Sequence, residues 1–205
     1  MKPLILFITG TDTGVGKTVF AALLTQHLRA RGVCVAALKP ICSGSRGDAR
    51  ALRAAAGKVL SLDEVNPWHF RAALTPLLAA RKEKKRVRLR EVVACIRGVA
   101  KRFDVVVVEG AGGLLSPLGE DFDSRELILA LAATPIIVCP NKLGAVNQVR
   151  LVVSALPRAT ARQARVILVN PARPDAASRS NLKLLKQFVD PNRPRVMPWL
   201  RGEKP

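Results

Sequence analysis

The sequence predicts an α/β fold, a single doubly wound, mostly parallel sheet with helices on both faces. Short apolar runs of strand length alternate along the chain with longer segments of helical periodicity. This alternation is typical of parallel strands joined by right-handed crossovers. The chain has 205 residues, 49% of them hydrophobic, which suits one such domain and is short for two. We therefore expect a single domain over residues 1–205.

The strands and helices are expected from the pattern of apolar residues. Four consecutive valines within residues 104–109 suit an interior strand that is covered on both faces. Further strands are expected at 4–9, 33–38, 135–140 and 165–170, with a candidate edge strand at 195–199. Helices are expected at 18–31, 48–57, 92–102, 124–133, 144–156 and 178–188, and the proline-containing stretch 58–80 is expected to be irregular.

Five connections follow strands and should gather at one edge of the sheet. They are residues 10–17, 39–48, 110–118 and 140–144 and the turn at Asn170. Ligands of open parallel sheets bind outside the carboxyl ends of the strands. We therefore expect the functional site there.

The chain is strongly basic, with a net charge of +19. Residues 81–102 hold ten basic and two acidic residues, and residues 158–205 hold eleven basic and three acidic ones. Neither segment matches a nucleic-acid-binding motif, and aromatic residues make up only 4% of the chain, so base-stacking platforms are not expected. The sequence favours a solvated face or a compositional bias over a specific nucleic-acid partner, and leaves a binding face open as the alternative.

Compartment and cysteine usage follow from simple counts. No apolar run reaches the ~18–20 residues of a membrane span, and the first apolar run, 4–9, is too short for a signal-peptide core. We therefore expect a cytoplasmic protein without a membrane partner. Four scattered cysteines lack metal-ligand spacing and are expected to be free thiols (Cys34, Cys42, Cys95 and Cys139).

A glycine-rich loop, GTDTGVGKT at residues 10–18, lies between the first expected strand and helix. Such a loop turns its amides inward and cradles phosphate groups at the start of a helix. Lys17 can reach the β- and γ-phosphates, and the Thr18 hydroxyl can ligate Mg²⁺. The motif indicates a fold of the P-loop NTPase type that binds ATP and Mg²⁺.

The residue at position 12 bears on an alternative function. P-loop ATPases of the chromosome-partitioning kind carry a second, signature lysine at that place, whereas this chain has Asp12. The acid weighs against a basic ATPase switch that acts on DNA or membrane. That switch remains the second hypothesis because of the charge.

A second lysine, Lys39, follows the second expected strand within KPICSG, residues 39–44. Positive charge there would stabilise a migrating phosphoryl group, with the hydroxyl of Ser43 nearby as a donor. A surface lysine before a turn is the alternative. Asp48 begins the next expected helix, and the sequence favours neither a helix N-cap nor a metal-shell acid for it.

The valine-rich strand ends in a carboxylate, Glu109, followed by Gly110, Ala111 and Gly112. A charge directly after four valines is poorly explained by packing. At that edge it is placed to bind Mg²⁺ opposite Thr18, and the glycines permit close backbone approach to an anion. We predict that this strand end belongs to the site.

Three motifs now stand in order: GTDTGVGKT, KPICSG and VEGAGGLLSP at 108–117. Together they closely resemble the dethiobiotin synthetase family, with further matches in VNPWHF at 65–70 and KLGAVNQ at 142–148. The resemblance implies an ATP-dependent homodimeric ligase that joins CO₂ to 7,8-diaminopelargonate through a carbamate and a carbamic-phosphoric anhydride, with no protein nucleophile. Related amidating synthetases usually carry a glutaminase domain, for which 205 residues leave no room.

The resemblance also implies roles for individual residues. Lys17 and Lys39 would neutralise phosphate and carbamate charge, while Thr13 and Ser43 would touch the carbamate or substrate. Thr18, Asp48 and Glu109 would form the Mg²⁺ shell. The nucleotide would contact Gly14, Val15, Gly16, Lys17, Thr18, Val19, Asp48, Glu109, Gly110, Ala111 and Gly112, with Asn170 and Pro171 at the adenine and Pro198, Trp199 and Leu200 flanking it. The substrate carboxylate would bind across a dimer interface at a helix start made of Gly144, Ala145, Val146 and Asn147.

Overall fold

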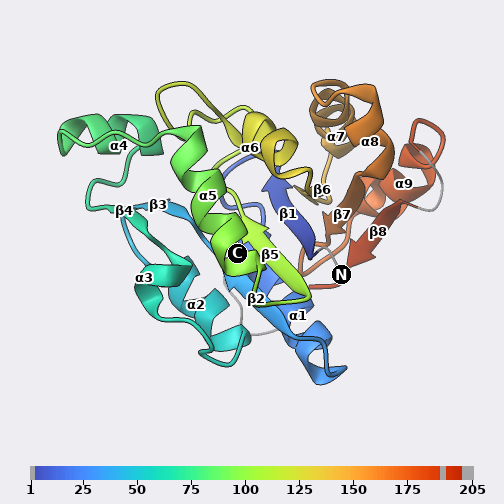
Figure 1. Ribbon diagram of the computed structural model, residues 1–205. Coiled ribbons are helices and arrows are strands. Elements are labelled where there is room, and N and C mark those ends of the chain that lie inside the picture. The colour runs from blue at the N-terminus through green and yellow to red at the C-terminus, as the bar shows by residue number, and fades with distance from the viewer. Residues whose placement is uncertain (1–2, 190–192, 200–205) are drawn as a thin grey trace.

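A computed structural model describes residues 3–189 and 193–199 and contains a central six-stranded parallel sheet. The strand order is β2-β5-β1-β6-β7-β8, with helices on both faces (Figure 1). The predicted fold class is therefore confirmed, as is the edge position of the last strand. The strands are β1 (Leu4–Gly10), β2 (Val35–Leu38), β5 (Val105–Glu109), β6 (Thr134–Pro140), β7 (Arg165–Val169) and β8 (Pro194–Met197).

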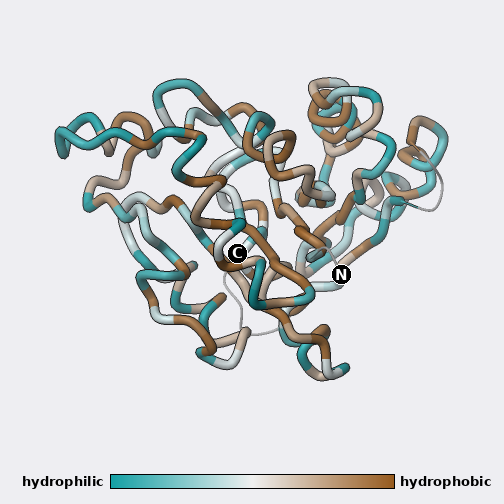
Figure 2. The backbone as a smooth tube through the Cα atoms, viewed as in Figure 1, coloured by the Kyte–Doolittle hydropathy of each residue, from teal (hydrophilic) through white to brown (hydrophobic). Residues whose placement is uncertain are grey.

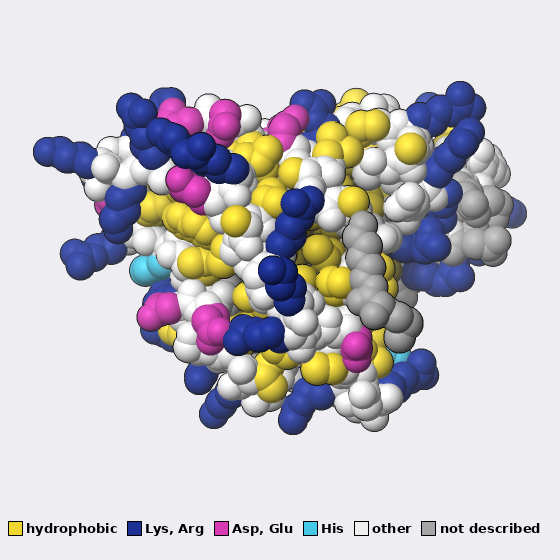
Figure 3. Space-filling view, in the orientation of Figure 1, with side chains coloured by type: hydrophobic (Ala, Val, Ile, Leu, Met, Phe, Trp, Pro, Cys, Tyr) yellow, Lys and Arg dark blue, Asp and Glu magenta, His cyan; other side chains and the backbone are white. Residues whose placement is uncertain are grey.

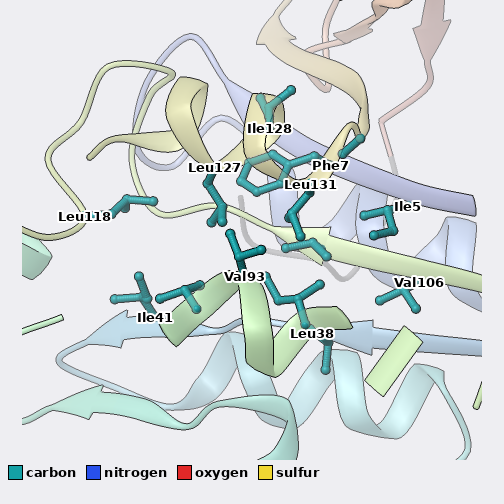
Figure 4. Close-up of a cluster of buried hydrophobic side chains, with 14 of the residues drawn as sticks. Ile5, Phe7, Leu38, Ile41, Val93, Val106, Leu118, Leu127, Ile128 and Leu131 are labelled. Carbon is teal, nitrogen blue, oxygen red and sulfur yellow. The ribbon is translucent and has the colours of Figure 1, made fainter. Parts of the chain in front are cut away.

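Alternate residues of each strand face opposite helical layers, as the two-residue period of a strand requires. Phe7, Leu38 and Val106 pack against one layer, the residues of which include Val93 of α5 and Ile128 of α6 (Figure 4). The opposite face of the same strands packs against α1 and α2. Hydrophobic residues accordingly concentrate along the central strands (Figure 2). The helices are α1 (Lys17–Ala30), α2 (Gly47–Ala55), α5 (Leu89–Ala100), α6 (Ser124–Leu131), α7 (Ala145–Ser154) and α9 (Ala176–Leu185).

The valine-rich strand β5 lies between β2 and β1, and all five of its residues are buried. In its parallel register with β1, Glu109 lies opposite Ile8. Ile8 is two residues before Gly10, where the glycine loop begins. This register brings the end of β5 next to the phosphate loop. The predicted interior position of the strand is confirmed.

The prediction for residues 58–80 was wrong, because this stretch is ordered into short elements. It contains α3 (Leu62–Val65), β4 (Trp68–Phe70) and the start of α4 (Pro76–Lys82). Strand β3 (Ile41–Ser43), inside the expected loop 39–48, pairs in parallel with β4. Local signals account for two of these elements: Ser61 and Glu64 form a capping box, and Pro76 occupies the first turn of α4.

One further helix, α8 (Arg158–Gln163), was not predicted. Its six residues form no apolar stripe, and none of them is buried. The observed ends of other elements differ from the expected ones by a few residues. Helix α5, for example, begins at Leu89 rather than at 92, and β2 begins at Val35 rather than at 33.

The basic segment 81–102 covers the end of α4 and all of α5, and its Lys and Arg side chains are exposed. Lys and Arg side chains are scattered over the visible face, mainly around its edges, and include a group over the region of α4 and α5 (Figure 3). Exposed ion pairs such as Arg81–Glu120 and Arg102–Glu64 offset only part of this charge. Within the part of the chain that the structure describes, every helix is too short or too polar to cross a membrane.

Candidate active site

A cavity of about 710 Å³ opens at the carboxyl edge of the sheet, where the predicted loops converge. Its walls hold Lys17 and Thr18 from the phosphate loop, Lys39 from the end of β2, Asp48 from α2 and Glu109 from the end of β5. Lys17 and Glu109, which are 92 positions apart in the chain, thus meet in one pocket. The expected gathering of these loops is confirmed.

The phosphate loop has the backbone that an anion cradle requires. Gly14 and Gly16 have φ values of 72° and 94°, in the left-handed region that strains other residues. Gly16 is the N-cap of α1 and supplies no side-chain cap, so the first amides of this 14-residue helix are open to an anion. Lys17 is 6% exposed, and its Nζ donates to the carbonyl of Asp12 at 2.7 Å.

The Glu109 carboxylate is the centre of the site and is only 1% exposed. Its Oε1 accepts from Lys39 Nζ at 2.6 Å and from the Thr18 hydroxyl at 2.8 Å. Its Oε2 has no hydrogen-bond partner among the described residues. A buried carboxylate oxygen without a partner is costly, so this atom marks a position where a cation or a donor is needed.

Lys39 is a buried cation held by two acids, and the surface-lysine alternative is wrong. Its Nζ contacts Asp48 Oδ2 at 3.1 Å and also donates to the Gly110 carbonyl at 3.1 Å. Burial alone lowers the pKa of Lys39, but the attraction of Glu109 and Asp48 outweighs it, so the pKa is raised and the ammonium stays charged.

Asp48 is not a helix N-cap. Helix α2 begins at Gly47 with Arg46 at the cap position, which places Asp48 in the first turn. Its side chain is 48% exposed and pairs with Lys39, inside the cavity. The structure therefore excludes the N-cap role of Asp48, and its role in metal binding remains a prediction.

The second lysine of the pocket behaves differently. Burial, followed by repulsion from Lys39, lowers the pKa of Lys17 from 10.5 to about 8, and the nearby acids Glu109, Asp48 and Asp12 only partly oppose this. Lys17 is therefore the cation of the pocket whose charge depends on pH near neutrality. An anion bound between the lysines would favour the charged form.

The remaining predicted residues divide into three groups. Thr13, Ser43, Ala111 and Gly112 line the large cavity, where the Ser43 hydroxyl donates to the Leu74 carbonyl at 2.5 Å. The predicted helix start begins α7 as expected, but none of its four residues lines either nucleotide-side cavity of the described chain (Gly144, Ala145, Val146 and Asn147).

A smaller cavity of about 180 Å³ lies on the other side of the phosphate loop. Gly14, Gly16 and Val19 line both cavities, so the two lie against the same loop and helix start. The predicted residues Val15, Asn170, Pro171, Pro198 and Trp199 all line the smaller one, whereas Leu200 lies outside the described residues. Further lining residues were not predicted as part of the site: Asn141, Lys142 and Met197 here, and Cys42, Leu74, Thr75, Pro76 and Ser116 in the larger cavity.

A buried amide connects two of the loops behind the larger cavity. Asn66 is 1% exposed; its Nδ2 donates to the Lys39 carbonyl at 2.8 Å, and its Oδ1 accepts from Arg46 Nε at 3.0 Å. Arg46 directly precedes the helix that bears Asp48. Asn66 therefore holds together the two loops that carry the Lys39–Asp48 pair.

Asn66→Ala should lower the free energy of unfolding by about 2 kcal/mol, because it leaves a buried carbonyl and a guanidinium N–H without partners. Urea unfolding monitored by circular dichroism would measure the change as a lower midpoint at an unchanged slope. The exposed Gln26→Ala on α1 serves as the matched control and should stay within about 0.5 kcal/mol of the parent. Equal midpoints for the two variants would contradict this role.

The parallel sheet, the glycine loop at the start of α1 and its buried lysine define a P-loop nucleotide-binding protein. A family model described as an AAA domain matches residues 5–199. An ATP-dependent dethiobiotin synthetase of Anaeromyxobacter dehalogenans (strain 2CP-C) is 45% identical over 157 residues, 75% of this chain and 70% of that protein. One from Akkermansia muciniphila is 34% identical over 184 residues, 89% and 86% of the two chains. The chain belongs to the dethiobiotin synthetase family and is an ATP-dependent ligase of biotin biosynthesis.

A solved structure supports the fold independently. The crystal structure of a ParA family ATPase from Chlorobium tepidum TLS superposes with a TM-score of 0.59, covering 98% of this chain and 86% of that one. The two sequences are only 14% identical, so the likeness shows the P-loop fold alone.

Proposed function

We propose that residues 1–205 form one synthetase domain that uses ATP to join CO₂ to 7,8-diaminopelargonate and close the ureido ring of dethiobiotin. The observation that carries the proposal is the Lys39–Glu109 contact of 2.6 Å in a pocket that also contains Lys17 and Thr18. This arrangement surrounds one position with two ammonium groups and a carboxylate–hydroxyl pair. A phosphoryl group in transfer needs such an environment.

The proposed reaction has three steps. One amine of the substrate adds to CO₂ and loses a proton, which gives a carbamate. A carbamate oxygen attacks the γ-phosphorus of ATP, and ADP leaves. The second amine then attacks the carbamate carbon and loses a proton, the C–O bond to the phosphoryl group breaks, and phosphate leaves with that oxygen.

The protein acts in these steps by positioning and by charge. Lys17, at the phosphate loop, would offset charge on the β- and γ-phosphates, and Lys39 would offset charge on the carbamate and the transferred phosphoryl group. The hydroxyls of Thr13 and Ser43 line the same cavity and would orient the carbamate. Bringing the reactants together in one orientation supplies much of the rate increase in reactions of this kind.

The residues present fit a magnesium ion. Glu109 Oε2 is buried without a partner, and the Thr18 hydroxyl and the Asp48 carboxylate line the same cavity. Two carboxylates and a hydroxyl suit Mg²⁺, which prefers oxygen ligands and keeps several waters. Mg²⁺ held by Thr18, Asp48 and Glu109 would offset charge on the phosphate oxygens of ATP.

A homodimer would complete the substrate site. Helix α7 has ten residues, and its N-cap, Gly144, supplies no side-chain cap. The amide of Ala145 donates to the Lys142 carbonyl, whereas those of Val146 and Asn147 donate to no backbone atom of the described residues and are available to an anion. These features support the proposal that residues 144–147 of a second copy bind the carboxylate of 7,8-diaminopelargonate.

Phosphate release from ATP tests the proposed function. The purified protein with Mg²⁺ should release phosphate only when 7,8-diaminopelargonate and bicarbonate are both present, and mass spectrometry should detect dethiobiotin in equal amount. Phosphate release that is independent of either compound, from folded protein, would refute the proposal and favour an ATPase switch.

The affinity for ATP should fall as pH rises through about 8. The phosphates bind the charged form of Lys17, so the neutral form that prevails above its pKa of about 8 must first take up a proton. At pH 9 about one molecule in ten holds that proton before binding, which weakens the apparent affinity about tenfold relative to pH 7.

Calorimetry with saturating Mg²⁺, in two buffers of different ionisation enthalpy, would measure both the affinity and the proton uptake at pH 9. Lys17→Arg is the control: its guanidinium stays charged, so its affinity, although weaker, should not change between pH 7 and 9. A flat profile for the parent would contradict the role of Lys17.

A further inference from the structure

Three asparagine side chains form a chain of hydrogen bonds behind the smaller cavity. Asn181, on α9, donates from Nδ2 to Asn141 Oδ1 at 2.9 Å. Asn141, directly after β6, donates from Nδ2 to Asn170 Oδ1 at 2.7 Å. Asn141 and Asn181 are 1% and 7% exposed, whereas Asn170 is half-buried and lines the cavity after β7.

The orientation of every amide in this chain follows from two backbone carbonyls, which can only accept. Asn181 Nδ2 donates to the Lys142 carbonyl at 2.9 Å, and Asn141 Nδ2 donates to the Ser178 carbonyl at 2.8 Å. The Asn141 group that faces Asn170 is therefore an N–H₂ group, and the Asn170 atom opposite it must be the oxygen. Turning Asn170 over would place two N–H₂ groups against each other.

Within this hydrogen-bond network, all side-chain N–H donors of Asn141 and Asn181 have acceptors. Each N–H₂ group has two hydrogens, and those of Asn141 and Asn181 each have two acceptors. The Nδ2 of Asn170, in contrast, donates to no atom of residues 3–189 or 193–199. It is the side-chain amide donor that remains for a ligand at this wall of the cavity.

The other walls suit a flat heterocycle. Most of them are apolar side chains and the ring of Trp199. The cavity shares Gly14, Gly16 and Val19 with the larger one, so a base placed here would lie beside the glycine loop that is expected to hold the phosphates. A pocket of this kind gains affinity from apolar contact and orientation from a few polar groups.

We propose that Asn141, held by Asn181 and the Ser178 carbonyl, is a positioning residue that fixes Asn170 with its N–H₂ group toward the base. The smaller cavity therefore selects a base that offers an acceptor ring nitrogen at that point. The inference rests on the proposed function in one respect, namely that this cavity receives the base of ATP.

Binding of ATP analogues in which one ring nitrogen is replaced by C–H tests the inference. Titration calorimetry with Mg²⁺ would compare ATP with its 1-deaza, 3-deaza and 7-deaza analogues. The parent should bind one of the three about tenfold more weakly than ATP, because one hydrogen bond to a base nitrogen is lost.

Asn141→Asp places an acceptor where a donor stood. Asn170 should then turn to donate its Nδ2 to the new carboxylate and present its oxygen to the base. The tenfold difference between ATP and the sensitive analogue should fall to within about twofold. The added negative charge weakens both ligands alike, so it leaves their ratio unchanged. The exposed Gln187→Glu, an equivalent amide-to-acid change beyond α9, should retain the full difference.

Asn170→Asp is the second variant, because it keeps an acceptor for Asn141 on the cavity wall and removes the remaining donor, while its added charge acts on all four nucleotides alike. It should also abolish the difference between analogues. The inference is overturned if the parent binds all four nucleotides alike, if folded Asn141→Asp keeps the tenfold difference, or if Asn170→Asp keeps it. A parent that distinguishes the analogues but releases no phosphate with both co-substrates would instead refute the proposed function and leave this inference intact.

Discussion

Lys39→Ala should lower kcat by a factor on the order of 10³ while the affinity for ATP changes little, because preorganised charge at the reacting centre acts mainly on the transition state. Lys17 and the amides of the glycine loop, which would hold the nucleotide, remain in place. The loss should appear in single-turnover phosphate release, and ATP affinity should be measured separately by calorimetry. A kcat within about threefold of the parent would contradict the role of Lys39.

Two further variants separate chemistry from folding. Lys39→Ala leaves Glu109 and Asp48 without their cation, which should lower the free energy of unfolding by about 3 kcal/mol. Lys39→Arg keeps the charge, so it should recover most of this stability but little of the turnover, since a planar guanidinium cannot replace a compact ammonium. Lys183→Ala, an exposed lysine on α9, should match the parent in both measurements.

Glu109→Gln should lower kcat by a factor on the order of 10² or more, and raising Mg²⁺ should not restore it. The change preserves the shape of the side chain but removes the negative charge that Lys39 contacts at 2.6 Å. It also replaces the unpartnered Oε2 with a weaker oxygen ligand or an N–H₂ group.

The dependence of kcat on Mg²⁺ concentration distinguishes the loss of the negative charge that Lys39 contacts from the loss of a Mg²⁺ ligand. The parent should saturate at low millimolar Mg²⁺ or below, whereas the variant should need far more. Glu64→Gln, at an exposed ion pair with Arg102, is the matched control and should leave kcat and its Mg²⁺ dependence unchanged. A Glu109→Gln variant with normal Mg²⁺ dependence would show that this carboxylate has no metal role.

The sequence predicted those parts of the fold that depend on long apolar runs. The valines of β5 and the apolar residues of β1 and β6 can be covered only by burial in a sheet, so their pattern leaves little choice. The sequence predicted that Lys39 and Glu109 belong to one site, but not that they contact each other. Lys39 directly follows β2 and Glu109 ends β5, and the observed register, with Leu38 opposite Val108, brings the two residues together.

Several short elements without a long apolar run could not be predicted from periodicity. Strands β3 and β4 have three residues each and are stabilised by pairing with each other, which no local pattern encodes. Helix α8 has no buried face, and α4 has an N-terminal signal in Pro76 that is easily read as a break. Their existence depends on tertiary contacts.

The buried polar networks were also hidden from sequence reasoning. Asn66 and Arg46 are 20 residues apart, and Asn141 and Asn181 are 40 apart, so only the folded chain reveals that they are partners. The family match VNPWHF contains Asn66. It does not reveal what the side chains contact or how their amides are oriented.

The origin of the oxygen atoms in the released phosphate tests the central claim most directly. With ¹⁸O-labelled bicarbonate and short reaction times, the proposed anhydride predicts one ¹⁸O atom per phosphate, because the carbamate oxygen that attacks the γ-phosphorus leaves with it. Phosphate without ¹⁸O, formed at the same rate as dethiobiotin, would show that water rather than the carbamate attacks the nucleotide. That result would contradict a pocket in which Lys17 and Lys39 surround a phosphoryl group moving to the substrate.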